Sequence, residues 1–361
     1  MRRTNYSRIV IASLAIVIAS GLPARPEDPS TSNGTAYLTA LQKKLGKGAS
    51  YRVGDSKAFR LVQKTKQALL QANMENVPMF AVNPEVEKRA FDVAVHAIAA
   101  TRIPKNFREL DAMRPKKLPV RVLRSAPGAD PSAVTFDWRA LGKTTPVRTY
   151  LSNTGQDGCG CCWCFAAIAA YEGNRLLVIG GDPATFDASE QHILNCGNTG
   201  GCNGDWYYTA WAYMQSHGTA TEANVPYAAV VGSCNTGVAT PCLVDTYGLV
   251  SHADDTPSRA AIKNALSQYG PLAVAVDATQ NFVAYADGVF IDYPSDPANV
   301  SVNHAVTLIG WDDTQSAWLI KNSWGNDWGS SCGLGSEKGY MWIGYENNNI
   351  GYAAAWTVAK D

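Results

Sequence analysis

The sequence predicts an α+β protein with two lobes and a separate N-terminal region. The chain has 361 residues, enough for about two folding units at ~100–200 residues per domain. Alanine-rich helical patterns occupy residues 160–220, whereas strand patterns rich in β-branched and aromatic residues begin near residue 246. Helices followed by strands are typical of α+β proteins. All nine cysteines and all ten tryptophans lie after residue 130, which predicts a boundary near residues 130–135.

The first residues have the character of an export signal. Three arginines precede residue 9, and residues 9–20 are an unbroken run of apolar and small side chains. This run is shorter than the ~20 apolar residues that span a bilayer, which favours a signal peptide over residues 1–24 rather than a membrane anchor. Export implies an oxidising compartment, where disulfides persist. The periplasm, a lysosome-like compartment and the cell exterior all fit.

Residues 25–132 form a second region, which contains neither cysteine nor tryptophan. Helical periodicity predicts helices near residues 37–45, 59–71 and 85–103. A charged linker interrupted by prolines follows these patterns. The region is long enough to be either a segment that serves the downstream domain or an unrelated N-terminal domain.

The last third of the chain contains the strand patterns, and the overall composition excludes several classes of partner. Four strands are expected at residues 271–276, 306–309, 317–320 and 340–343. The chain is 46% hydrophobic and 17% charged, with a formal net charge of zero, so we expect a substantial core. We expect no nucleic-acid partner, because such partners are bound through excess basic charge. We also expect no stable membrane insertion once the signal is removed.

A cluster of four cysteines is the most informative stretch, and it consists of Cys159, Cys161, Cys162 and Cys164. The residues alone allow a thiolate metal cluster, a redox pair of Cys159 with Cys162, or a nucleophile with structural neighbours. A helical run begins directly after Cys162, and a helix N-terminus favours the thiolate. A nucleophilic thiol also needs a base and a group that orients the base. His304 begins an apolar strand and Asn322 ends the next, so adjacent strands could bring them together.

These residues resemble the papain-like cysteine peptidases. The family signature C-G-[SA]-C-[WY] is matched by residues 159–163 except at Cys161, and His304 and Asn322 follow Cys162 by 142 and 160 residues. Other similar motifs lie at residues 137–139, 189–196, 201–204, 270–277 and 318–325. The resemblance implies a papain-like peptidase domain over residues 133–361. It would have a helical left lobe, an antiparallel β-barrel-like right lobe and the active-site cleft between them.

The resemblance implies a role for each catalytic position. Cys162 would be the nucleophile, His304 would hold its proton as an imidazolium and deliver it to the leaving amine, and Asn322 would orient the imidazole. Gln156, six residues before Cys162, would form the oxyanion hole with the Cys162 backbone N–H. Trp324 would shield the hydrogen bond between His304 and Asn322 from water.

Substrate-binding positions also follow from the resemblance. Gly204 and Asp205 occupy the segment whose backbone pairs with the substrate chain. Asp205 stands where the family usually has a second glycine, and we expect its side chain to narrow the cleft or to favour basic or polar substrates. Ala355 would form the floor of the main specificity pocket, where a small apolar residue accepts a bulky apolar one. The resemblance implies no cofactor and no metal.

The remaining cysteines are interpreted in the same way. The resemblance implies two left-lobe disulfides, Cys159–Cys202 and Cys196–Cys234. Four thiols are then left besides the nucleophile: Cys161, Cys164, Cys242 and Cys332. We expect Cys164 to point into the helix core as a small hydrophobic side chain. A disulfide at Cys161 and a Cys242–Cys332 bridge stay open.

The predicted function is that of a secreted peptidase made as a zymogen, which hydrolyses peptide bonds through a thioester. Residues 25–132 resemble a propeptide by position and size, and would lie along the cleft as an inhibitor. Residues 1–130 contain 22 basic and 10 acidic residues, so the remainder carries a net charge of −12, consistent with electrostatic docking. The expected partners are peptide or protein substrates, the propeptide and proteinaceous cysteine-peptidase inhibitors. The alternatives are an acyl transferase or transpeptidase on the same site and a non-catalytic papain-like binding protein.

Overall fold

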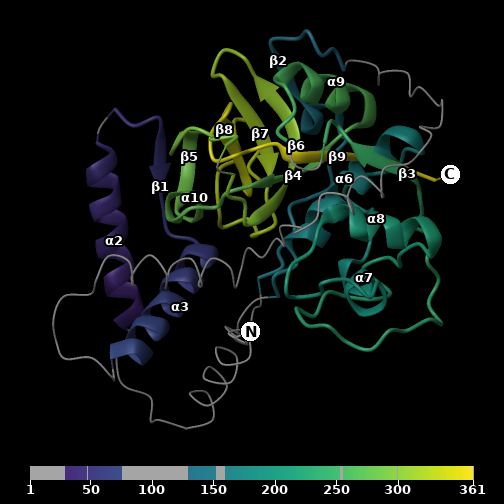
Figure 1. Cartoon of the computed structure of the whole chain (residues 1–361), viewed down its shortest axis with the longest axis horizontal. Helices are drawn as coiled ribbons and strands as arrows, with labels where there is room; N and C mark the ends of the chain where they lie inside the picture. The colour runs from purple at the N-terminus through teal and green to yellow at the C-terminus, as the bar shows by residue number, and fades with distance from the viewer. Residues whose placement is uncertain are drawn as a thin grey trace, which may run out of the picture.

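The computed structural model has the α+β architecture that the sequence predicts. It describes residues 29–46, 48–74, 129–151, 159–252, 255–298 and 300–360. Within these residues a lobe of helices packs against a lobe built around a nine-stranded sheet (Figure 1). No helix in this described part of the chain is long and apolar enough to cross a membrane.

The N-terminal region contributes two helices and a short strand. Helix α2 spans Pro29–Leu45, strand β1 spans Tyr51–Val53 and helix α3 spans Lys57–Met74. The helices predicted at residues 37–45 and 59–71 are therefore confirmed, with more residues than expected. Strand β1 was not expected, because three residues are too few to show a periodicity. The predicted signal peptide and the predicted helix at residues 85–103 lie outside the described residues.

The helical lobe is organised around one central helix. Helix α6 spans Cys162–Val178 and packs against strands β4, β6 and β9 of the other lobe and against helices α7 and α8. Helix α7 spans Glu190–Cys196 and helix α8 spans Tyr207–Ser216. The absence of a side chain at Gly173 allows close packing, since a Cβ there would lie 2.4 Å from Cγ of Pro271.

The sheet lobe contains the remaining strands. Their bounds are Thr135–Asp137 for β2, Val244–Leu249 for β3, Leu272–Val276 for β4, Tyr285–Phe290 for β5, His304–Asp312 for β6, Ala317–Lys321 for β7, Tyr340–Gly344 for β8 and Tyr352–Ala359 for β9. A 3₁₀ helix at Trp138–Leu141 follows β2, and helices α9, Arg259–Tyr269, and α10, Gln280–Val283, connect strands of this lobe. The predicted strands at residues 306–309, 317–320 and 340–343 lie within β6, β7 and β8, and the one predicted at residues 271–276 begins one residue before β4.

The strand order differs in two respects from the antiparallel β-barrel-like lobe that was expected. The order is β1-β5-β8-β7-β6-β4-β9-β3, with β2 paired to β6, so the sheet is open in the described residues. Strands β5 and β8 are parallel, whereas the other pairs are antiparallel. The sheet stays open because β1 and β3, at its two ends, do not pair with each other.

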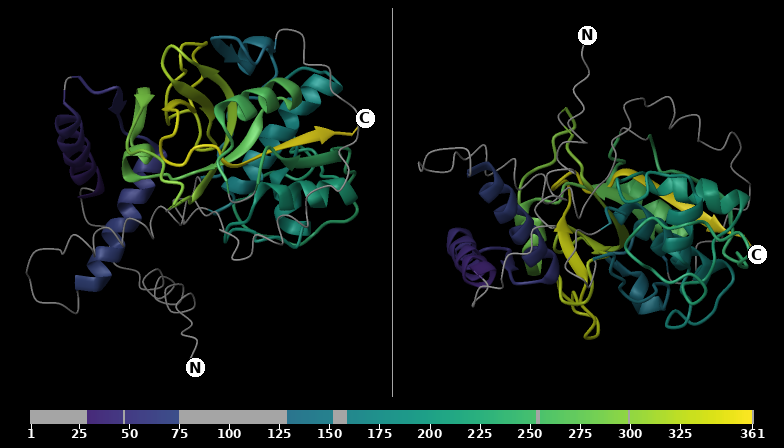
Figure 2. Two further views of the ribbon diagram at one scale, coloured as in Figure 1. Left: turned by 45° about the horizontal axis from the view of Figure 1, so that its top comes forward. Right: turned by 90° about the horizontal axis from the view of Figure 1, so that it is seen from below.

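The N-terminal region is joined to one edge of this sheet. Strand β1 pairs with β5, with Tyr51 opposite Gly288, and the Tyr51 ring packs 4.8 Å from that of Phe290. Helices α2 and α3 lie beside this edge, on the opposite side of the molecule from α7 and α8 (Figures 1 and 2). The chain therefore adds a strand from its N-terminal region to the sheet of its C-terminal part.

Candidate active site

Cys162 lies at the N-terminus of the central helix. It is the first residue of α6, is fully buried and is not in a disulfide. Apolar and alanine side chains follow it, and they bury this end of the helix against the sheet lobe. The N-terminal end of a helix is the positive end of its dipole, which favours a thiolate over a thiol.

His304 and Asn322 lie together, as the sequence predicted. His304 begins β6, Asn322 directly follows β7, and these two strands pair antiparallel. His304 Nε2 lies 2.9 Å from Asn322 Oδ1, which also accepts the backbone N–H of Ser323 at 2.8 Å. Because an amide oxygen only accepts, Nε2 carries the proton in the neutral ring. His304 Nδ1, which has no hydrogen-bond partner among the described residues, is then the nitrogen that can accept one.

Aromatic rings enclose the His304 side chain. The Trp324 ring stacks on it with centroids 4.7 Å apart and an interplanar angle of 21°, and Phe282 lies edge-on at 6.1 Å. Trp324 Nε1 donates to the Tyr150 hydroxyl at 2.6 Å. This arrangement agrees with the shielding position expected for Trp324.

Burial changes the proton affinity of His304. Loss of solvation lowers its pKa from 6.5 to about 4, although the hydrogen bond to Asn322 opposes this shift. Desolvation disfavours the charged form of an imidazole. In the conformation described, His304 is therefore neutral near pH 7, which differs from the imidazolium expected from the sequence.

Two tyrosines that the sequence did not single out link the two sides of the site. The Tyr150 ring lies 6.4 Å from that of His304 and 5.6 Å from that of Phe165, which is in the first turn of α6. Tyr227 donates to the Tyr150 carbonyl at 3.1 Å, and its hydroxyl lies 3.1 Å from Sγ of Cys161. Burial raises the pKa of Cys161 well above its ordinary value, so this neighbouring thiol is held neutral.

The structure contains the two disulfides that the resemblance implied, Cys159–Cys202 and Cys196–Cys234. The four thiols left open by the sequence, Cys161, Cys164, Cys242 and Cys332, are all free. Neither a disulfide at Cys161 nor a Cys242–Cys332 bridge is formed. Cys164 is fully buried in the helical lobe, as expected.

The substrate-binding positions are distributed around this centre. Gly204 is buried with φ +86°, and the Asp205 carboxylate is bound by two backbone N–H groups, those of Gly200 and Trp206. Ala355 lies in β9, paired with Ala273 of β4 and Leu249 of β3, so it is two strands away from the strand of His304. Gln156 lies outside the described residues.

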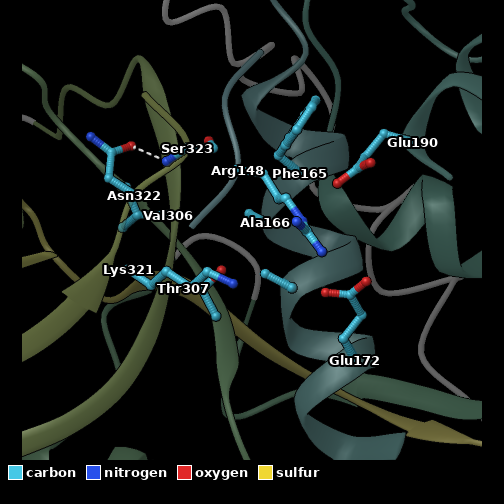
Figure 3. A pocket seen from close by; sticks show the side chains of 11 residues that line it. Arg148, Phe165, Ala166, Glu172, Glu190, Val306, Thr307, Lys321, Asn322 and Ser323 are labelled. Carbon is cyan, nitrogen blue, oxygen red and sulfur yellow. Dashed lines mark hydrogen bonds between the residues drawn. The ribbon is translucent and has the colours of Figure 1, made fainter. Parts of the chain in front are cut away.

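A group of charged side chains lies between helix α6 and the sheet (Figure 3), with Glu172, Glu190 and Lys321 buried and Arg148 partly exposed. Arg148, Glu172, Glu190 and Lys321 line a cavity of about 10 Å³, together with Asn322. The Glu172 and Glu190 carboxylates point into this cavity toward the Arg148 guanidinium. This volume is at the lower limit of what one water molecule needs.

Hydrogen bonds tie these charges to both lobes. Glu172 accepts from the Thr145 hydroxyl and from the Ala188 N–H, and Lys321 Nζ donates to the Thr145 carbonyl at 2.7 Å. Burial raises the pKa of Glu172 and Glu190 and lowers that of Lys321 to about 8. This group could not be expected from the sequence, because hydropathy patterns do not reveal buried ionisable residues.

Metal ligation finds no support in the part of the chain described. It contains no group of three or more histidine, cysteine, aspartate and glutamate side chains that could hold a metal ion. Cys159, a member of the cysteine cluster, is bonded to Cys202 rather than to Cys162. The cluster is thus divided between a disulfide and free thiols.

Comparisons with known proteins agree with this geometry. The family model described as "Papain family cysteine protease" matches residues 132–359. Cysteine proteinases 1 and 2 of Entamoeba histolytica are each 34% identical over 62% and 61% of this chain, and the match spans 66% of their length, just under two thirds. Bromelain from Ananas comosus, solved with the E64 inhibitor, is 32% identical with a TM-score of 0.53, covering 63% of this chain and 100% of that one. Digestive procathepsin L2 from Tenebrio molitor shares the fold over 90% of this chain and 99% of that one, with 23% identity and a TM-score of 0.59. The chain belongs to the papain family of cysteine proteases.

Proposed function

We propose that this protein is a cysteine peptidase that hydrolyses peptide bonds through Cys162, His304 and Asn322. The observation that carries the proposal is the 2.9 Å contact between His304 Nε2 and Asn322 Oδ1. It fixes the tautomer and leaves Nδ1 as the nitrogen that can take a proton from a thiol. The position of Cys162 at the start of α6 supports its role as that thiol.

The reaction would proceed by acyl transfer through the thiol. The Cys162 thiolate attacks the substrate carbonyl carbon, and the imidazolium of His304 protonates the departing amine, which leaves a thioester. Water, deprotonated by the neutral imidazole, then hydrolyses the thioester and releases Cys162. The Cys162 backbone N–H and the Gln156 side-chain amide would stabilise the oxyanion in both steps.

We also propose that the described conformation is an inactive precursor. Residues 25–132 would be the propeptide, and contacts of α3 close to the site support this assignment. Lys57 Nζ donates to the Leu151 carbonyl at 3.1 Å, next to Tyr150, and the Lys57 N–H donates to Asp327 Oδ2 at 2.6 Å, three residues after Trp324. The low pKa of His304 is consistent with an inactive state, because a neutral imidazole cannot pair with a thiolate.

The same proposal indicates the compartment and the partners of the enzyme. The signal-like residues 1–24 favour export to the periplasm, a lysosome-like compartment or the exterior. Peptide or protein substrates, the propeptide and proteinaceous cysteine-peptidase inhibitors would be its partners. The net charge of −12 on the part after residue 130 favours docking of the basic N-terminal region.

The test compares Cys162→Ala with a matched variant, Cys164→Ala, in protein from which the N-terminal region has been removed. Cys164 is a buried free thiol of the same helix, two residues away. We expect Cys162→Ala to lose turnover of a peptide substrate by about three orders of magnitude or more, and Cys164→Ala to retain it. Equal turnover in wild type and Cys162→Ala would refute the nucleophile. Activity of the full-length chain equal to or higher than that of the shortened one would refute the precursor.

A further inference from the structure

The Asp205 side chain is used inside its own loop and does not project free toward a ligand. Its Oδ2 accepts the backbone N–H of Gly200 at 2.6 Å, and its Oδ1 accepts that of Trp206 at 2.8 Å. Each carboxylate oxygen therefore already has a backbone donor. The expectation that this carboxylate narrows the cleft or selects basic substrates does not agree with this arrangement.

The carboxylate closes a tight loop over residues 200–205. A Cβ added at Gly200 would lie 1.9 Å from the Gly204 carbonyl oxygen and 3.1 Å from Cβ of Asp205. Asn203 donates its N–H to the Gly200 carbonyl at 3.0 Å. The two ends of the loop thus touch, and the Asp205 carboxylate bonds one end to the other.

This loop is also fixed to the start of the helix that begins with Cys162. Gly160 donates its N–H to the Cys202 carbonyl at 3.0 Å, and Trp163 Nε1 donates to the Gly201 carbonyl at 3.1 Å. The Cys159–Cys202 disulfide adds a covalent link. The attachment points lie on both sides of Cys162 in the sequence, so the conformation of the loop sets where the Gly204 backbone lies relative to the thiol.

We infer that Asp205 is a positioning residue, whose carboxylate holds the backbone of residues 204 and 205 in place to bind the main chain of a peptide substrate. This inference rests on the proposed function, because it needs a peptide bound beside Cys162. A charge-assisted bond from a backbone N–H to a carboxylate is stronger than a neutral one, which suits it to hold a loop without regular structure. The role is carried by a side chain at a position where the family usually has none.

The test measures Asp205→Asn and Asp205→Gly against a matched variant, Asp182→Asn, in protein without the N-terminal region. Asp182 also accepts a backbone N–H, that of Ala184 at 2.9 Å, but in a surface turn away from the site. We expect KM for a peptide to rise about tenfold or more in both Asp205 variants, with kcat changed less than about twofold, as for loss of uniform binding. Asp182→Asn should match wild type.

Two further readouts separate this inference from the proposed function. The rate of Cys162 alkylation by iodoacetamide, which needs no substrate main chain, should be the same in wild type and the Asp205 variants. Hydrogen exchange at the Gly200 N–H should be about tenfold or more faster in Asp205→Gly, because its bond to the Asp205 carboxylate is lost.

The outcomes are then distinct. A wild type that alkylates but does not turn over peptide contradicts the proposed function, and the Gly200 exchange rate still tests the role of the carboxylate. Unchanged KM, or unchanged exchange at Gly200, overturns the positioning role. A fall in kcat together with slower alkylation also overturns it, because the carboxylate would then maintain the whole site. Should Asp205→Asn fold poorly, Gly200→Ala strains the loop from its other end and should raise KM in the same way.

Discussion

The hydrogen bond between His304 Nε2 and Asn322 Oδ1 determines which ring nitrogen of His304 can accept a proton. Asn322 Oδ1 accepts from His304 Nε2 and from the Ser323 N–H, so the amide cannot rotate without losing both bonds. A neutral amide orients the ring without adding a charge, and the Trp324 ring stacks on the imidazole. The hydrogen bond that orients His304 therefore comes from one side chain, which the N–H of the next residue holds in place.

Replacement of Asn322 tests this dependence. In Asn322→Ala the buried Nε2–H loses its partner, which costs about 1–3 kcal/mol and should lower kcat/KM about 10- to 100-fold. The measurement is peptide turnover across pH in the shortened protein. Asn281→Ala is the control, since that amide donates to Asp292 and does not contact His304. Activity within about twofold of wild type in Asn322→Ala would mean that the ring is oriented by packing alone.

Residues that stand in motifs could be singled out from the sequence, whereas those that only the fold brings together could not. Cys162, His304 and Asn322 stand in short motifs at the start of a helix, the start of a strand and the end of a strand. Tyr150 and Tyr227 belong to no motif. Only the fold brings the Tyr150 ring against Phe165 and the Tyr227 hydroxyl against Cys161. Asp205 was recognised as a departure, but its hydrogen bonds depend on a loop conformation that no periodicity describes.

At the scale of elements, long regular segments were predicted and short pairings were not. The apolar run at residues 306–309 indicated a strand, yet β6 extends over His304–Asp312, because pairing with β4 and β7 also holds polar residues extended. Strand β1 has only three residues, and these are extended because they pair antiparallel with β5. Whether the sheet is open or closed likewise depends on which distant strands pair, and this cannot be read from local sequence patterns.

Gly288 offers a test of how β1 is held on β5. Its φ is +88°, and a Cβ there would lie 2.4 Å from the Ser50 carbonyl oxygen and 2.9 Å from Cα of Tyr51. All the closest atoms belong to the N-terminal region. In Gly288→Ala we expect β1 to detach, so that limited proteolysis of the N-terminal region of the full chain becomes about tenfold faster.

The shortened protein and a second glycine supply the controls. The left-handed backbone costs roughly 1 kcal/mol for alanine with or without the N-terminal region, so kcat/KM of shortened Gly288→Ala should stay within about twofold of wild type. Gly142→Ala carries the same kind of strain, at φ +63°, with nothing within 4 Å of the added Cβ. Equal proteolysis of the Gly288→Ala and Gly142→Ala chains would show that β1 does not restrain the region.

For the whole molecule, the ionisable groups between the lobes set the pH dependence of stability. Burial raises the pKa of Glu172, Glu190 and Asp187, and raises that of Glu222 to about 7. The folded state then binds protons more tightly than the unfolded chain. The stability from these carboxyls is fully present below their unfolded pKa values, 4.5 for the glutamates and 3.8 for Asp187, and is lost as the pH rises through their folded pKa.

Among the groups whose pKa shifts in the opposite sense, His304 and Lys321 act in different pH ranges. The pKa of His304 falls from 6.5 to about 4, so its stability contribution is lost as the pH falls from about 6.5 to about 4. The pKa of Lys321 falls from 10.5 to about 8, so its contribution is absent below about pH 8 and grows above it. Because these contributions to stability overlap, the effect of one carboxyl is measured by comparing wild type with a variant at that residue alone.

Glu222 is suited to that comparison, because glutamine reproduces its protonated form. Its Oε1 accepts the Tyr227 N–H at 2.6 Å, which glutamine can also accept, and its Oε2 is buried without a partner among the described residues. Glu222→Gln should melt at the wild-type temperature at pH 4, below the unfolded pKa of 4.5, and a few degrees higher at pH 8. Roughly 1 kcal/mol shifts Tm by ~2–4 °C at this size, and a partly exposed group delivers less than its full pKa shift. Thermal melts at both pH values check this, with Glu346→Gln, an exposed partner of Arg259, as the control that should move at neither. A Glu222→Gln protein less stable than wild type at pH 8 would mean that this carboxylate is charged and paired in the folded state.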